Sequence, residues 1–182
     1  VIDGKTAFTG GVNLADEYIN HIERFGHWKD TAIMLKGDAV ESFSLMFLQM
    51  WNIDEKLPQF PEQLDVPEPA PAQGYVIPYI DILNRAHSYV YIMTPYLILD
   101  GEMETALKFA ANRGVDVRII LPGIPDKKIP YALAKTHYKA LLSAGVKLYE
   151  YTPGFVHAKV FLSDRRESGG GASKLYYRRL YH

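Results

Sequence analysis

From residue 80 to residue 163 the chain alternates between stretches with the apolar spacing of helices and stretches with that of strands. Gly114 and Gly145 directly follow two of the helical stretches, as is usual where a helix ends in a left-handed residue. This alternation predicts an α/β fold with a sheet covered by helices on both faces. The expected helices are residues 80–86, 102–112 and 131–143, and the expected strands are residues 89–94, 115–121, 146–151 and 156–163.

A proline-rich segment separates this region from what precedes it. Between residues 54 and 74 the prolines are interspersed with acidic residues, and proline interrupts helices and central strands, so the segment is predicted to be a linker. Before it, residues 6–9 and 31–36 are expected to form strands and residues 39–52 a helix. The apolar stripe of this helix, expected to pack in a core, consists of Val40, Phe43, Phe47, Met50 and Trp51.

One short motif carries the chemistry. His157 and Lys159 are two residues apart in an expected strand, so their side chains point the same way and can converge on one group. An imidazole attacks phosphorus or transfers a proton near neutral pH, and an ammonium neutralises phosphoryl oxygens, so the pair predicts a phosphate site. A lone His-x-Lys pair is more often a solvated surface pair. Asp164, five residues further on, and the neighbouring segments favour the functional interpretation.

The pattern His-x-Lys-x-x-x-x-Asp at residues 157–164 resembles the signature of the phospholipase D superfamily. Thr94-Pro95-Tyr96 and residues 111–122 and 144–155 look like bacterial cardiolipin synthases, in the same order, and residues 1–13 resemble the end of that family's first signature. The resemblance implies a phospholipase D-like α/β repeat with a mixed, mostly β sheet flanked by helices. Residues 1–53 would be the truncated first repeat, 54–74 the linker and 75–182 the second repeat.

The resemblance also implies that the chain begins inside an active site. Asp3 matches the aspartate that closes the first signature, so the first histidine and lysine would precede Val1. Without that first pair, the chain is expected to be an inactive fragment of its parent.

Further roles follow from the same resemblance. Asp30 would be the catalytic acid that accepts a hydrogen bond from the missing first histidine. Asp164 closes the second signature and is counted with the catalytic residues. Its expected role is more structural than chemical, because it would pair with nearby hydrogen-bond donors. The substrate phosphate would be bound by Gly10, Gly11, Asn13 and Tyr96.

In this family one histidine forms a phosphohistidine, while the other protonates the leaving alcohol and activates the incoming one. The resemblance implies that two phosphatidylglycerol molecules yield cardiolipin and glycerol, with His157 as general acid and base and Lys159 on the phosphoryl oxygens. No metal or other cofactor is required. The implied partners are the phospholipid phosphatidylglycerol and a membrane surface, reached through the parent protein at a bacterial cell membrane. The fragment would be soluble or peripheral, on the cytoplasmic side.

Composition bounds these expectations. With 182 residues, 48% of them hydrophobic, the chain can bury a core. A net charge of −1 supplies no basic footprint, so a nucleic-acid partner is not favoured. The chain has no cysteine, and no apolar run approaches the roughly 20 residues that span a bilayer. Nothing in the composition indicates an oligomeric state.

The end of the chain departs from the family pattern. Lys174 and Tyr176 stand where the family has asparagine and aspartate, and residues 165–170 replace an apolar strand. A local sequence error between residues 165 and 179 is one hypothesis for this loss. If the residues are genuine, two alternatives stay open: a non-catalytic phosphate-binding or structural domain, and a phosphodiesterase or nuclease of the same superfamily.

Overall fold

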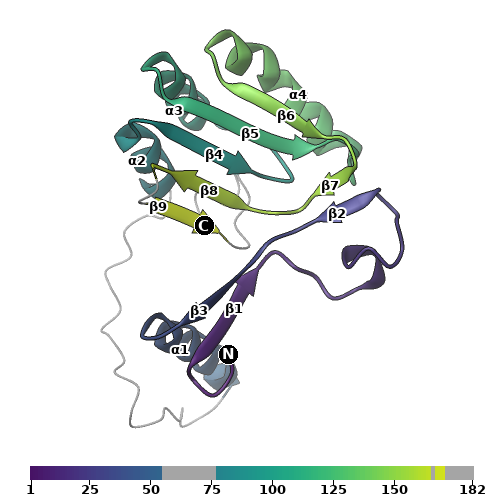
Figure 1. Cartoon of the computed structure of the whole chain (residues 1–182), viewed down its shortest axis with the longest axis vertical. Helices are drawn as coiled ribbons and strands as arrows, with labels where there is room; N and C mark the ends of the chain where they lie inside the picture. Colours follow the sequence, from purple (N-terminus) through teal and green to yellow (C-terminus); the bar gives the residue numbers. More distant parts are fainter. Residues whose placement is uncertain (55–76, 165–166, 171–182) are drawn as a thin grey trace. The chain divides into compact units, whose positions relative to one another are not determined.

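The computed structural model describes residues 1–54, 77–164 and 167–170 (Figure 1), and these fall into two compact units. Residues 1–9 and 33–54 belong to the first unit, and residues 10–32 belong with the region after residue 77. The contacts therefore group residues 10–32 with the expected second repeat. The division of the chain by repeats stays a prediction, and residues 55–74 of the expected linker lie outside the described residues.

The larger unit is built on a five-stranded mixed sheet with the strand order β6-β5-β4-β8-β9. β4 (Tyr89–Met93), β5 (Asp116–Pro122) and β6 (Lys147–Tyr151) are parallel. β8 (Val160–Ser163) runs antiparallel to both β4 and β9 (Glu167–Gly170). The mixed sheet confirms the predicted fold class.

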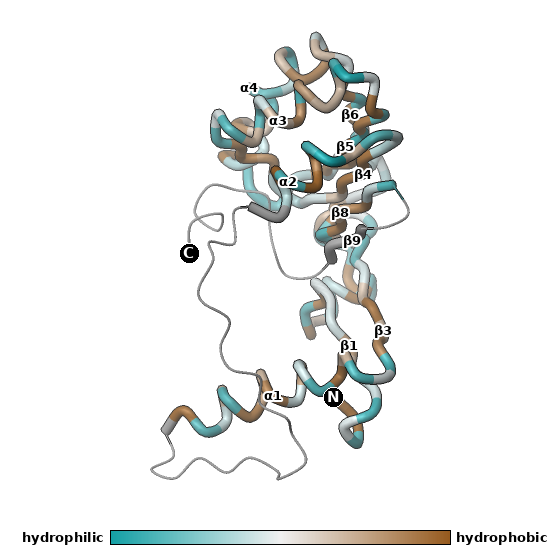
Figure 2. Tube along the Cα trace, turned by 90° about the vertical axis from the view of Figure 1, so that its left-hand side faces the viewer, coloured by the Kyte–Doolittle hydropathy of each residue, from teal (hydrophilic) through white to brown (hydrophobic). Residues whose placement is uncertain are grey.

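Three helices pack together beside this sheet: α2 (Ile77–Arg85), α3 (Gly101–Asn112) and α4 (Lys128–Ser143). They cover one face of it (Figure 2). Along β4 and β5, buried residues alternate with half-buried ones such as Tyr91 and Arg118. Within the larger unit, the expectation of helices on both faces is therefore wrong for the described residues. None of the described helices is long and apolar enough to cross a bilayer.

The core lies between the helices and the sheet, and local signals define the helix ends. The Asp100 side chain accepts a hydrogen bond from the Met103 amide at 2.7 Å and caps α3. Gly114 and Gly145 have φ values of +92° and +93° after α3 and α4, as predicted. Among the fully buried core side chains are Leu83, Ile92, Leu97, Met103, Leu107, Ile119, Leu121 and Leu141.

The smaller unit contains most of the strand pair β1 (Thr6–Gly10) and β3 (Ala32–Lys36), together with α1 (Ala39–Trp51) and the single turn η2 (Asn52–Asp54). Val40 is fully buried, but Phe47 is 57% exposed and Trp51 is 69% exposed. The expected core packing of the whole α1 stripe is therefore wrong among the described residues. Helical periodicity identifies an apolar face without identifying what covers it.

Candidate active site

A short parallel strand pair brings the two parts of the candidate site together. β2 (His27–Lys29) pairs with β7 (Gly154–Val156). The Lys29 carbonyl then accepts a hydrogen bond from the His157 amide at 2.8 Å. Because parallel strands end at the same edge, Asp30 and His157 leave the pair side by side although they are distant in sequence.

His157 lies between a carboxylate and an ammonium. Its Nδ1 is 2.7 Å from Asp30 Oδ2, and Lys159 Nζ is 2.7 Å from its Nε2 and 2.9 Å from its Nδ1. A carboxylate can only accept a hydrogen bond, so in the neutral ring we assign the proton to Nδ1, facing Asp30. Lys159 Nζ lies near both ring nitrogens, and of the two only the unprotonated Nε2 can accept a hydrogen bond from it. Nε2 is then the nitrogen that can take or give a proton in a reaction.

All three side chains of this cluster are buried. The exposed fraction is 9% for His157 and 6% for Lys159, and 7% for the side chain of Asp30. A buried ammonium and a buried carboxylate offset each other's charge, which makes their joint burial tolerable. Their low-dielectric surroundings strengthen any interaction with an anionic group that enters.

The structure shows a partner of Asp30 that the sequence analysis did not name. Its carboxylate contacts His157, the histidine of the second signature, and its expected contact with the first-signature histidine stays a prediction. Asp30 lies much closer in sequence to the first signature, and only the β2–β7 pairing reveals that the strand before it runs beside the second.

The backbone of the His-x-Lys motif differs from the expected strand. Residues 157–159 do not continue a regular strand, because β7 ends at Val156 and β8 begins at Val160. The His157 and Lys159 side chains nevertheless converge as predicted. The break is where the chain passes from the β2–β7 pair to the main sheet.

Gly11 supplies the closest backbone approach to the cluster. A Cβ at this position would lie 2.6 Å from Asp30 Oδ1 and 2.8 Å from Lys159 Nζ. The Gly11 amide is held by the Thr31 carbonyl at 3.3 Å. Only glycine leaves room here for the buried charged side chains, so Gly11 lies beside the cluster, and its expected phosphate binding stays a prediction.

We expect Gly11→Ala in the full-length protein to lower about 100-fold the turnover of the phosphatidyl transfer that the family resemblance implies, because the added Cβ displaces Asp30 and Lys159 from the positions in which they meet the substrate. Gly101→Ala is the matched control, since nothing lies within 4 Å of a Cβ there. Steady-state kinetics of both variants check this result. Equal activity of the two variants would show that the Gly11 approach is unimportant.

Aromatic rings that the sequence analysis did not single out form one wall of the site. The Trp28 ring lies against that of His157 with centroids 5.0 Å apart, and Phe155 lies 4.7 Å from Trp28 and 6.2 Å from His157. Asn20 bonds both the amide and the carbonyl of Trp28, at 2.6 and 3.0 Å. These contacts fix the plane of the imidazole. The sequence feature that could have pointed to this wall is the aromatic residue Phe155, two positions before His157.

Other predicted phosphate-binding residues lie outside this cluster of contacts. The Tyr96 hydroxyl donates to Asp126 Oδ2 at 2.5 Å. In this arrangement the hydroxyl hydrogen of Tyr96 is directed to a carboxylate, and the expected role of Tyr96 in phosphate binding stays a prediction. Asn13 is exposed, and Gly10 approaches the backbone of Thr31.

Asp164 lies at the far end of β8, where it organises a turn. Its carboxylate accepts hydrogen bonds from the amides of His87, Ser88 and Tyr89 at 2.7 to 2.9 Å. These amides, that of His87 foremost, hold the pKa of Asp164 below its usual value. Asp164 is five residue steps from Lys159, or about 16 Å along an extended chain, so its carboxylate contacts the turn amides and lies away from the cluster.

Asp3 occupies a matching turn. It follows Ile2, which bridges Thr6, just as Asp164 follows Ser163, which pairs with Glu167. Both aspartates adopt positive φ, 50° for Asp3 and 46° for Asp164. The equal turn length supports the match between Asp3 and Asp164 that the sequence predicts.

We expect Asp164→Asn to destabilise the full-length protein by about 1–2 kcal/mol at neutral pH, because charge-assisted hydrogen bonds to three amides weaken. The pKa of Asp164 is lower in the folded state than in the unfolded state, so the ionised carboxylate stabilises the fold at pH values above its unfolded-state pKa. This stabilisation is lost as the pH falls through the folded-state pKa. The difference should therefore shrink below about pH 4. Urea unfolding across pH 3–7 measures it, with Asp81→Asn, which removes a half-exposed carboxylate paired with Arg85, as the control. A pH-independent difference would contradict this account.

Metal ligands do not gather in the described part of the chain. No group of three or more His, Asp or Glu side chains comes together there as a candidate metal site.

The mixed sheet and the buried histidine and lysine define a phospholipase D-like α/β domain. Residues 79–178 match the family described as cardiolipin synthase, PLD-like domain, and the chain belongs to this family. It is 61% identical over 198 residues to an uncharacterized protein of Streptococcus mutans serotype c, covering all of this chain and 43% of that protein. It is 36% identical over 199 residues to a cardiolipin synthase of Geobacillus thermodenitrificans, covering all of this chain and 39% of the synthase.

A solved structure agrees with the fold. The crystal structure of phosphatidylserine synthase from Haemophilus influenzae superimposes with a TM-score of 0.56 at 13% identity, over 88% of this chain and 50% of that one. The chain spans about two fifths of the length of the curated relatives described above.

Proposed function

We propose that the chain provides the second half of a phosphatidyl-transfer site in a cardiolipin synthase. The observation that carries this is the buried contact of His157 with Asp30 on Nδ1 and Lys159 on Nε2. Family membership supports a phospholipid as the substrate. A phosphate that enters would take the Lys159 ammonium as its partner and free Nε2 for proton transfer.

In the proposed reaction, a histidine of the first signature attacks the phosphorus of one phosphatidylglycerol. The P–O bond to glycerol breaks, and His157, which enters this step as the imidazolium with both ring nitrogens protonated, gives the leaving oxygen its Nε2 proton. The resulting phosphohistidine is then attacked by a hydroxyl of a second phosphatidylglycerol, whose proton returns to His157. The sum is two phosphatidylglycerol molecules converted to cardiolipin and glycerol. The chemistry would take place at a membrane surface, where these lipids are found.

Incubation of the full-length protein with phosphatidylglycerol vesicles tests this function. We expect cardiolipin to accumulate. Cleavage of a DNA phosphodiester without lipid turnover would favour the nuclease alternative. Turnover of neither substrate would favour a non-catalytic domain.

A further inference from the structure

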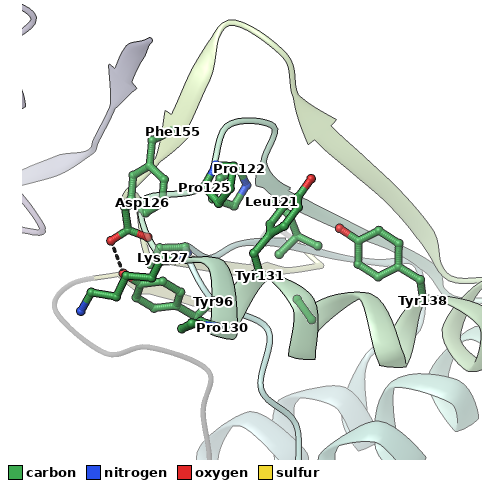
Figure 3. Close-up of a pocket in the computed structure, with 12 residues that line it drawn as sticks. Tyr96, Leu121, Pro122, Pro125, Asp126, Lys127, Pro130, Tyr131, Tyr138 and Phe155 are labelled. Carbon is green, nitrogen blue, oxygen red and sulfur yellow. Dashed lines mark hydrogen bonds between the residues drawn. The ribbon is translucent and has the colours of Figure 1, made fainter. Parts of the chain in front are cut away.

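A small cavity lies next to the candidate active site, at the carboxyl ends of β4 and β5 and the start of α4 (Figure 3). Ligands of α/β sheets commonly bind at this end of the strands. Phe155 lines the cavity and also packs against the His157 ring. The cavity and the reacting imidazole are therefore connected through one shared side chain.

The walls of the cavity are mostly apolar and stiff. They are formed mainly by prolines and aromatic rings, among them Pro95, Pro122, Pro125, Pro130, Tyr131 and Tyr138. The free space between them holds about one water-sized group. A single small polar group fits here, whereas an acyl chain does not.

One carboxylate provides the polar contact. Asp126 Oδ2 accepts the hydrogen bond of Tyr96, while Asp126 Oδ1 is buried without a hydrogen-bond partner among the described residues. A buried acceptor without a donor costs stability, and such groups are rare in folded proteins. Because a carboxylate only accepts, the missing partner is an O–H or N–H group.

We propose that Asp126 binds a hydroxyl group of the glycerol headgroup of the substrate. This proposal rests on the proposed function, since phosphatidylglycerol carries free hydroxyls beyond its phosphodiester. A hydroxyl suits the site better than an ammonium, because Asp126 Oδ1 is one acceptor among mostly apolar walls and would satisfy only one of the three N–H donors of an ammonium. The hydroxyl completes the hydrogen bonding of Asp126 and orients the glycerol toward His157.

Acceptor selectivity of the full-length protein tests this subsite. Phosphatidyl transfer to glycerol and to 1-propanol, which lacks the extra hydroxyls, is measured for wild type and Asp126→Asn. The substitution puts an N–H donor in place of an acceptor. We expect it to lower the preference for glycerol at least about tenfold while transfer to 1-propanol stays within about twofold. Asp81→Asn, at a half-exposed carboxylate of α2 that does not line the cavity, should keep the wild-type preference.

A binding measurement separates this proposal from the proposed function. Saturation-transfer NMR of glycerol, 1-propanol and ethanolamine with the full-length protein needs no turnover. Loss of the glycerol signal in Asp126→Asn, in a protein that transfers no phosphatidyl group, would support the subsite and refute the transferase.

Two results would overturn the subsite: an unchanged glycerol signal or preference in Asp126→Asn, or a stronger signal for ethanolamine than for glycerol. Should Asp126→Asn fail to fold, Asp126→Glu decides the question. It keeps the charge but shifts both oxygens, and it should also lose the glycerol preference.

Discussion

Replacing His157 with asparagine in the full-length protein is expected to lower phosphatidyl transfer about 1,000-fold or more, with the fold retained. The asparagine amide keeps approximate volume and can still bond Asp30 and Lys159, but it cannot transfer a proton. Turnover at saturating phosphatidylglycerol measures the effect, and thermal unfolding checks the fold.

The chain offers a matched control for this variant. His27 stands in an identical His-x-Lys spacing with Lys29, yet it is exposed and bonds the Tyr151 hydroxyl at 2.9 Å. His27→Asn should leave turnover within about twofold of wild type, as is usual for a surface substitution. Wild-type turnover in His157→Asn would remove His157 from the mechanism.

Replacing Asp30 with asparagine is expected to lower kcat about 100-fold or more, by analogy with the aspartate of a catalytic triad. In the proposed mechanism, the carboxylate holds the Nδ1 proton of His157 and stabilises the imidazolium that forms when Nε2 takes a proton. Because Asp30 acts through His157, KM for phosphatidylglycerol should change much less than kcat. Steady-state kinetics on lipid vesicles resolve the two parameters.

Two comparisons make the Asp30 result specific. Asp30→Glu retains the charge and should recover part of the loss in kcat. Exposed Asp38, just before α1, is the control for removing one negative charge from the surface. A rise in KM with unchanged kcat would mean that Asp30 binds substrate without acting through His157.

Much of the larger unit could be predicted because its signals are local. The strand and helix periods, together with Gly114 and Gly145, predict β4, α3, β5, α4 and β6 to within three residues at each end. The convergence of His157 and Lys159 is predicted from their two-residue spacing in an expected strand, and the side chains converge although residues 157–159 lie between β7 and β8.

The site's long-range contacts could not be predicted in the same way. The partner of Asp30 depends on the pairing of β2 with β7, and no local pattern encodes which strands pair across so long a separation. The Trp28 wall and the Asp126 cavity could not be predicted for the same reason, because their lining residues come from several elements of the fold. Periodicity likewise indicated the apolar face of α1 but not its surroundings.

The most direct test of the central claim is the simultaneous quantification of cardiolipin and free glycerol made from phosphatidylglycerol by the full-length protein. Transfer through the His157 site predicts one glycerol released for each cardiolipin formed, and neither product from His157→Asn. Glycerol release matched by phosphatidic acid, or equal cardiolipin formation by His157→Asn, would contradict it.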